Sequence, residues 1–172
     1  MTTAFISLNM IGIPNKRSLA MEGAIVICCP GEKDKHDTAL LRAPCPFGSL
    51  EPEQRRAANW ALHRSGVVWN DSTELSTPEE WSARLIDMVV NLGVTMIVTK
   101  GFAQLDFVRA ALKGRCLAVP VIAGEQISIP AFQDMNDAVP FTCCEHHSNL
   151  NINNARYCSL HRALQLKQYF YF

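Results

Sequence analysis

The sequence lacks several features that would assign it to a common class of protein. Its 16 Lys and Arg residues balance 16 Asp and Glu residues, so the whole molecule has no basic footprint for nucleic acid or for an anionic membrane. No apolar run reaches the ~20 residues that span a bilayer, so we expect no membrane association. There is also no phosphate-binding glycine loop and no nucleophile elbow.

A secretory leader is missing as well. The N-terminus, M-T-T-A-F-I, has no basic region and too short an apolar run. We therefore expect an intracellular protein, in the cytoplasm or the nucleus, where thiols stay reduced. The seven cysteines then indicate buried thiols or metal ligands rather than disulfides. Four of them lie on apolar strands or beside proline and are interpreted as core residues: Cys28, Cys29, Cys45 and Cys116.

The sequence does have the composition and the turn signals of one α/β domain, residues 1–172. With 48% hydrophobic and 19% charged residues, it is long enough to build a hydrophobic core. Short apolar runs predict three antiparallel strands, followed by helices and two buried parallel strands. The expected elements are strands 4–10, 23–29 and 38–43, helices 49–66 and 77–92, strand 95–99, helix 100–112, strand 116–119 and a closing helix 155–172.

Helix punctuation is clearest in the middle of the chain. Thr77 is the expected N-cap of the second helix, Pro78 its first residue and Glu80 the partner that completes a capping box. Ser49 is the expected cap of the preceding helix, with Pro52 in its first turn. Three tryptophans lie on or beside these helices at spacings that favour packing over a base-stacking surface: Trp60, Trp69 and Trp81.

A Cys/His cluster lies in the segment 141–172, together with the closing helix. The pattern Cys144-x2-His147-x10-Cys158-x2-His161 has the paired short spacings of a structural zinc site. Four protein ligands favour structural zinc over catalytic zinc with an open position. Two alternatives remain at this point. The shifted pair Cys143 and His146 has the same spacing, and the residues can also be buried thiols beside exposed histidines.

Three strings, in chain order, resemble motifs of one family. The first strand, F-I-S-L-N, looks like apolar-apolar-Asp-apolar-Glu, and K-G-F-A-Q-L-D-F-V-R-A-A-L looks like a helix start that carries an Asp. Near the C-terminus, Y-C-S-L-H-R-A-L-Q-L is similar to His-x-Ala-Leu-x-Asp-Ala. Between them, His63 to Val67 resembles a helix end with the motif His-Gly-Ile. Together with the strand order, these strings resemble the DEDD-type 3′–5′ exonucleases of the RNase H-like fold, in a degenerate form that also occurs in viruses and mobile elements.

The resemblance implies where a two-metal site would lie. Such a site holds two divalent ions about 3.5–4 Å apart and needs acidic ligands. The first motif's acids fall on Ser7 and Asn9, the second motif's acid on Asp106, and the third motif's His and Asp on Tyr157 and Arg162. Only Asp106 keeps a carboxylate, and an arginine repels Mg²⁺. We therefore expect a pseudoenzyme, with no catalytic residues.

Three functions follow from these observations. The first is an inactive exonuclease-fold protein that binds nucleic acid or a protein partner. The second is a zinc-stabilised structural or interaction protein that does not bind nucleic acid. The third is an active metal-dependent nuclease with a non-standard site. For the first, candidate cations for a local basic surface are Arg55, Arg56, Arg64, Arg156, Arg162 and Lys167.

Overall fold

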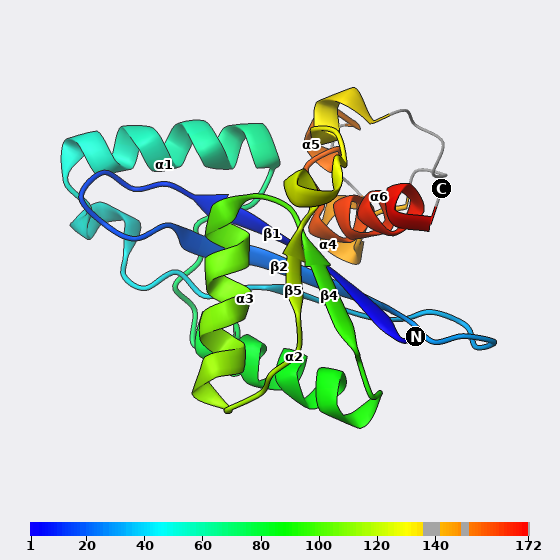
Figure 1. Cartoon of the computed structure of the whole chain (residues 1–172). Helices are drawn as coiled ribbons and strands as arrows, with labels where there is room; N and C mark the ends of the chain where they lie inside the picture. Colours follow the sequence, from blue (N-terminus) through cyan, green and yellow to red (C-terminus); the bar gives the residue numbers. More distant parts are fainter. Residues whose placement is uncertain (136–141, 149–151, 172) are drawn as a thin grey trace.

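The computed structural model describes residues 1–135, 142–148 and 152–171. Its centre is a five-stranded sheet in the order β3-β2-β1-β4-β5 (Figure 1). The strands are β1 (Thr3–Ile11), β2 (Leu19–Cys28), β3 (Lys35–Leu40), β4 (Met96–Thr99) and β5 (Val121–Ala123). The first three pair antiparallel, whereas β4 runs parallel to β1 and β5 parallel to β4. The predicted α/β class, with three antiparallel strands followed by parallel strands, is confirmed.

Helices cover both faces of the sheet (Figure 1). On one face, Ile6 and Leu8 of β1 pack in a core cluster with α2 (Pro78–Asn91) and α3 (Phe102–Gly114). On the other face, Phe5 packs with α6 (Ser159–Tyr171). Because side chains alternate along a strand, Ser7 and Asn9 share the face of Phe5. A third cluster packs α1 (Pro52–Ser65) against the far ends of β1 and β2.

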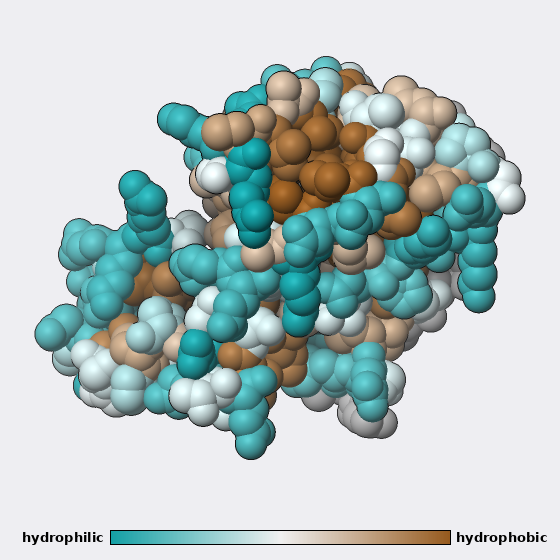
Figure 2. All heavy atoms as spheres, turned by 90° about the horizontal axis from the view of Figure 1, so that it is seen from below, coloured by the Kyte–Doolittle hydropathy of each residue, from teal (hydrophilic) through white to brown (hydrophobic). Residues whose placement is uncertain are grey.

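The remaining elements are short. They are the 3₁₀ helices η1 (Phe47–Ser49), η2 (Gly124–Ile127) and η3 (Phe132–Asp134), and the single-turn helices α4 (Glu145–Ser148) and α5 (Ile152–Ala155). None of the helices in the described part of the chain combines the length and the apolar character that crossing a membrane requires. Seen from below, an apolar patch interrupts a mainly hydrophilic surface (Figure 2).

The capping signals predicted the start of α2 and missed that of α1. Thr77 Oγ1 accepts a hydrogen bond from the Glu80 backbone N–H, and the Glu80 carboxylate accepts one from the Thr77 backbone N–H, as predicted. The cap of α1 is Glu51 rather than Ser49. Ser49 instead ends η1, where its hydroxyl donates to the Pro46 carbonyl.

The fifth strand lies later than predicted, at Val121–Ala123 rather than 116–119. Residues 115–117 continue the end of α3, since the Leu117 N–H bonds back to the Leu112 carbonyl. Cys116 has φ of 55° and is exposed, so its interpretation as a core residue is wrong. Pro120 has no N–H, and the strand begins directly after it. Of the other three cysteines in that interpretation, Cys28 is buried, and Cys29 and Cys45 are half-buried.

The closing helix also begins later than predicted. Residues 156–158 form a turn after α5, in which the Cys158 N–H bonds to the Ala155 carbonyl. The helix starts at Ser159, whose backbone N–H donates to the Glu22 carboxylate of β2 at 3.1 Å. A carboxylate at this end satisfies an otherwise unpaired N–H and suits the helix dipole.

Trp81 fixes α2 on the sheet. Its indole is fully buried against Gly23 of β2, where an added Cβ would lie 2.6 Å from the ring. We predict that Gly23→Ala lowers the free energy of unfolding by about 1–3 kcal/mol, because the ring has to move out of a packed core. Gly48→Ala is the matched control, since nothing lies within 4 Å of its added Cβ. Denaturant titration measures both, and equal midpoints would contradict this packing.

Candidate metal centre and neighbouring basic pocket

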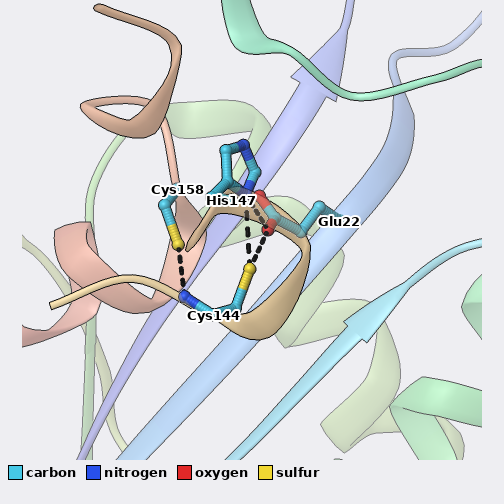
Figure 3. Close-up of side chains that lie close together, drawn as sticks. All are labelled: Glu22, Cys144, His147 and Cys158. Carbon is cyan, nitrogen blue, oxygen red and sulfur yellow. Dashed lines mark hydrogen bonds and ion pairs between the residues drawn. The ribbon is translucent and has the colours of Figure 1, made fainter. Parts of the chain in front are cut away.

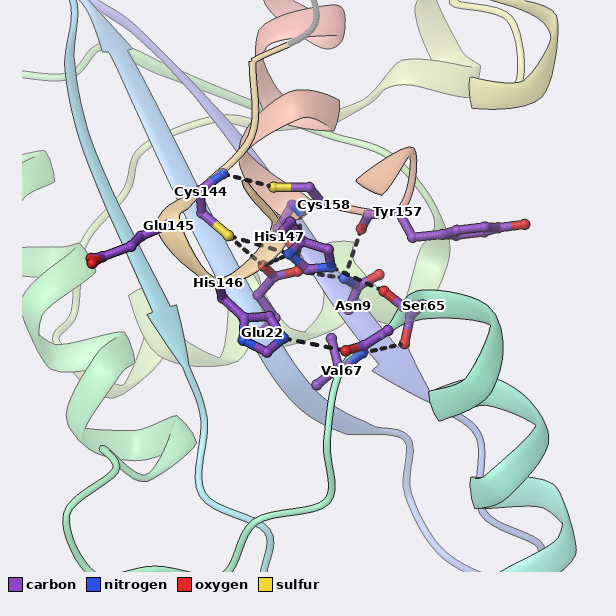
Figure 4. A network of polar contacts seen from close by, with 12 residues as sticks. Asn9, Glu22, Ser65, Val67, Cys144, Glu145, His146, His147, Tyr157 and Cys158 are labelled. Carbon is purple, nitrogen blue, oxygen red and sulfur yellow. Dashed lines mark hydrogen bonds and ion pairs between the residues drawn. The ribbon is translucent and has the colours of Figure 1, made fainter. Parts of the chain in front are cut away.

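A buried carboxylate, Glu22, organises the end of the sheet where α6 begins. It lies on β2 directly opposite Asn9 of β1. Its Oε2 accepts from the Asn9 side-chain amide, and from the backbone N–H and the hydroxyl of Ser159 at 3.1 and 3.0 Å. Its Oε1 faces the other way, 3.1 Å from His147 Nδ1 and 3.3 Å from Cys144 Sγ (Figure 4). One oxygen is therefore held by the scaffold and the other points into a Cys/His cluster.

Four buried side chains meet in this cluster. They are Glu22, Cys144, His147 and Cys158, and their potential ligand atoms all lie within 4.8 Å of one another (Figure 3). The Cys144 backbone N–H donates to Cys158 Sγ at 3.2 Å, and Cys144 Sγ lies 3.3 Å from His147 Nδ1. The cluster thus joins β2, α4 and the turn before α6.

The charges in the cluster are set by these contacts. Burial raises the pKa of Glu22, but the hydrogen bond and the charge of His147 outweigh it, so that the pKa lies below its usual value. Burial lowers the pKa of His147, but hydrogen bonds to Cys158 and Glu22 raise it to about 10. The hydrogen bond from Cys144 lowers the pKa of Cys158 to about 4 and raises that of Cys144. Two anionic groups, Glu22 and Cys158, therefore face a cationic His147.

The donor set fits a zinc ion. Two sulfurs, one imidazole nitrogen and one carboxylate oxygen are all zinc ligands, and a tetrahedral site places such atoms ~3.3–3.8 Å apart. His147 Nε2 lies 2.9 Å from the Ser65 carbonyl, which can only accept, so this nitrogen carries the proton and Nδ1 faces the cluster. A bound metal would displace the protons of His147 Nδ1 and the Cys144 thiol.

The structure brings together three of the four ligands predicted from the sequence. Cys144, His147 and Cys158 lie in the cluster, and the fourth member is Glu22. His161 is buried but lies outside this group, in the lining of a neighbouring pocket. The spacing pattern could not find Glu22, which is 122 residues away from Cys144. One signal was present, an isolated acid in the apolar strand L-A-M-E-G-A-I-V-I-C.

The end of α1 is tied to this region. The carbonyl groups at its C-terminal end contact side chains that come after β5 in the sequence. Asn154 Nδ2 donates to His63 and Arg64 at 2.8 and 3.0 Å. His146 Nε2 lies 3.2 Å from the Gly66 carbonyl. His146 of the shifted pair thus contacts α1, and neither it nor the half-buried Cys143 belongs to the cluster.

A small pocket beside the cluster collects the positions implied by the exonuclease resemblance. It has a volume of about 140 Å³, and its lining includes Asn9, Tyr157 and Arg162. Ser7, on the same strand, is fully buried, and its hydroxyl has no hydrogen-bond partner among the described residues. The Tyr157 carbonyl accepts from Asn9 Nδ2 at 2.7 Å, while the Tyr157 ring points away from the Cys/His cluster (Figure 4).

Asp106 does not join this group. It is exposed on α3. The residue of α3 that reaches β1 is Gln104, which lines the same small pocket and whose Oε1 accepts from the Leu8 backbone at 3.0 Å and from Thr99 Oγ1 at 3.3 Å. Leu8 lies between Ser7 and Asn9, so Gln104 rather than Asp106 is the residue of α3 that contacts this part of β1.

A larger pocket of about 760 Å³ adjoins the small one. Arg64, Tyr157 and Arg162 line both pockets. In the described part of the chain neither pocket is lined by an Asp or a Glu. The larger one is bordered by basic and aromatic side chains, namely His63, Arg64, Phe132, Arg156, Tyr157, His161 and Arg162.

Comparisons with known proteins agree with this architecture. No family model matches the sequence, and no curated protein matches it. A full-length 3′-exonuclease aligns with a TM-score of 0.61 at 12% identity, covering 97% of this chain and 78% of that one. The chain has a 3′-exonuclease fold. The nuclease domain of 3′hExo, a DEDDh family member bound to rAMP, aligns with a TM-score of 0.59 at 13% identity, covering 97% and 88%.

The exonuclease I of Methylocaldum szegediense also aligns, with a TM-score of 0.54 at 10% identity, over 98% of this chain and 40% of that one. The RNase H-like fold expected from the motif order is therefore confirmed. The degenerate character of the site and the viral or mobile-element origin stay predictions.

The two divalent ions implied by this fold do not fit the residues present. Asn9 and Gln104 offer amides, and Arg162 brings a positive charge to the pocket that both of them line. Divalent Mg²⁺ is held mainly by carboxylates and water, and a guanidinium at the same place opposes it. No reaction step through a metal pair can be derived from this pocket.

Glu22 gives the sharpest stability prediction of this region. We expect Glu22→Gln to lower the free energy of unfolding by about 3 kcal/mol or more, because it removes the buried carboxylate that Asn9, Ser159 and His147 share. Glu32→Gln is the control, since Glu32 forms an exposed ion pair with Lys35 and should change stability by less than ~1 kcal/mol. Urea denaturation followed by circular dichroism compares the two. Equal stability of both variants would show that Glu22 is not a structural centre.

Proposed function

We propose that this protein binds single-stranded nucleic acid in an exonuclease-like fold and does not cleave it by a two-metal mechanism. One observation carries the proposal. Asn9 and Arg162, two of the positions at which the resemblance implies metal-binding acids, line one pocket together with the amide of Gln104. An amide and a cation at positions of acids disfavour metal ions and favour the phosphate backbone.

The distribution of charge supports binding at this place. The chain is neutral as a whole, yet Arg64, Arg156 and Arg162 gather around one pocket beside His63 and His161, with no acidic lining residue in the described part of the chain. Local positive clefts attract phosphates through counterion release even when net charge is zero. The protein-binding version of this function has no comparable observation in its favour.

Binding and cleavage can be separated by experiment. We expect the protein to retain a labelled single-stranded oligonucleotide at 50 mM salt, with an affinity that falls as salt rises. Arg64→Ala should weaken binding about 3–10-fold, whereas Arg115→Ala, which removes an exposed arginine at the end of α3, should not. Filter binding measures both.

No product above the protein-free blank is expected with Mg²⁺ or Mn²⁺. Cleavage that disappears in Asp106→Ala would instead establish the third candidate, an active nuclease with a non-standard site.

A second candidate is a zinc-stabilised structural protein, and the Glu22, Cys144, His147 and Cys158 cluster favours it. In this role the ion replaces a hydrophobic anchor: it fixes α4 and the turn before α6 to β2, and through the Ser65 carbonyl to the end of α1. A zinc ion in the cluster is compatible with nucleic-acid binding, because the cluster and the basic pocket use different side chains; the two candidate functions differ in whether nucleic acid binds.

We predict about one zinc per chain in the purified protein, measured by elemental analysis. Cys158→Ser and Glu22→Gln should lower the zinc content, and chelation should lower the melting temperature. His161→Asn and Cys116→Ser should retain zinc, since both residues lie outside the cluster. Full zinc content and stability in Cys158→Ser would exclude the site. Loss of zinc in His161→Asn together with retention of zinc in Glu22→Gln would show that the fourth ligand is His161, as the sequence pattern predicts, and not Glu22.

A further inference from the structure

A stack of aromatic rings and guanidinium groups runs along the larger pocket. The Arg64 guanidinium lies 4.3 Å from the ring centre of Trp60 and 5.2 Å from that of Tyr157. The Arg162 guanidinium lies 4.6 Å from the ring centre of Tyr157 and 4.9 Å from that of Phe132. Trp60 is 65% exposed, so the prediction that it packs in the core is wrong. The residues of this stack come from three separate segments of the chain, and the aromatic rings hold the two arginines in place.

Neither arginine is paired directly with a carboxylate in the described part of the chain. No ion pair joins Arg64 or Arg162 to a carboxylate among the described residues, and Arg162 Nε is buried without a hydrogen-bond partner. Glu22, the buried acid of the neighbouring cluster, is already bonded to Asn9, Ser159 and His147. Burial lowers the pKa of Arg162 to about 10. The charge of Arg64 also lowers it, whereas Tyr157, Glu22 and Cys158 raise it.

This arrangement of the two arginines lowers the stability of the fold, so a purely structural role does not explain it. A buried donor without a partner destabilises the fold, and two like charges against one ring repel each other. A guanidinium over an aromatic ring keeps its N–H donors available, because the contact uses the face of the ring rather than hydrogen bonds. An anion placed between the two arginines would accept hydrogen bonds from these N–H donors and neutralise the repulsion between the two positive charges.

We propose that Arg64 and Arg162 form a metal-independent binding site for the phosphate group of a nucleotide. The inference rests on the proposed function and gives its ligand class. Two guanidinium groups can each donate paired N–H hydrogen bonds to the oxygens of one phosphate. The pocket of about 760 Å³ is within the size range of small-molecule sites, so it accommodates a nucleotide rather than a bare ion alone.

The test uses the whole protein as purified, with no divalent metal added. Inorganic phosphate and thymidine 5′-monophosphate are titrated against thermal unfolding, with sodium chloride at matched ionic strength as reference. At ten times Kd, we expect the nucleotide to raise the melting temperature by about 3 °C. Thymidine, which lacks the phosphate, should bind at least tenfold more weakly in calorimetry. Oligonucleotides with and without a terminal phosphate then show whether the bound phosphate belongs to the end of a strand or to a free nucleotide.

Variants at position 162 separate binding from packing. Arg162→Gln should keep or raise the melting temperature without ligand, because it removes an unpaired charge, and should lose the response to phosphate. Arg162→Lys should retain a weakened response, since it keeps the charge and loses the forked geometry. Arg115→Gln should behave as the unmodified protein.

Three results would overturn the proposal: no response to either phosphate compound at 10 mM, a response that appears only when Mg²⁺ is added, or an unchanged response in Arg162→Gln. Oligonucleotide binding that persists in any of these cases would leave the proposed function standing while removing this site.

Discussion

The contact on which the rest of this end of the molecule depends is the bonding of one buried carboxylate, Glu22. A charged group in a dry core is tolerated only when both oxygens are satisfied, and the partners of Glu22 come from β1, α4 and α6. Its burial therefore dictates where α6 begins and how α4 lies. Through His147 and the Ser65 carbonyl, the same constraint reaches the end of α1.

The cluster and the basic pocket are neighbours with opposite electrostatic character. Cys158 immediately precedes α6, and the backbone N–H of Arg162 bonds to the Cys158 carbonyl. The same helical turn thus places Cys158, a candidate metal ligand, in the buried cluster and Arg162, a cation, in the pocket. Because both residues sit on the same turn, anything that fixes the cluster also fixes the direction of the arginine.

Local signals in the sequence were enough for much of the fold. β1, β4 and the capping box of α2 could be predicted because apolar runs and N-terminal caps act within a few residues. The place of β5 was missed because apolar residues before Pro120 resemble a strand but complete the end of α3. Glu22 and Gln104 were missed because their roles come from residues that only the folded sheet brings near. Trp60 was misplaced because helical spacing does not say which face meets solvent.

The carbonyls at the end of α1 have a consequence for the order of events during synthesis. They are satisfied by His146, His147 and Asn154, which leave the ribosome 80 to 91 residues after the carbonyls that they contact. Until then this helix end, together with Glu22, lacks most of its native partners. The β1–β3 meander and α1 can form early, but the nascent chain can close this side of the sheet only when the last helix arrives.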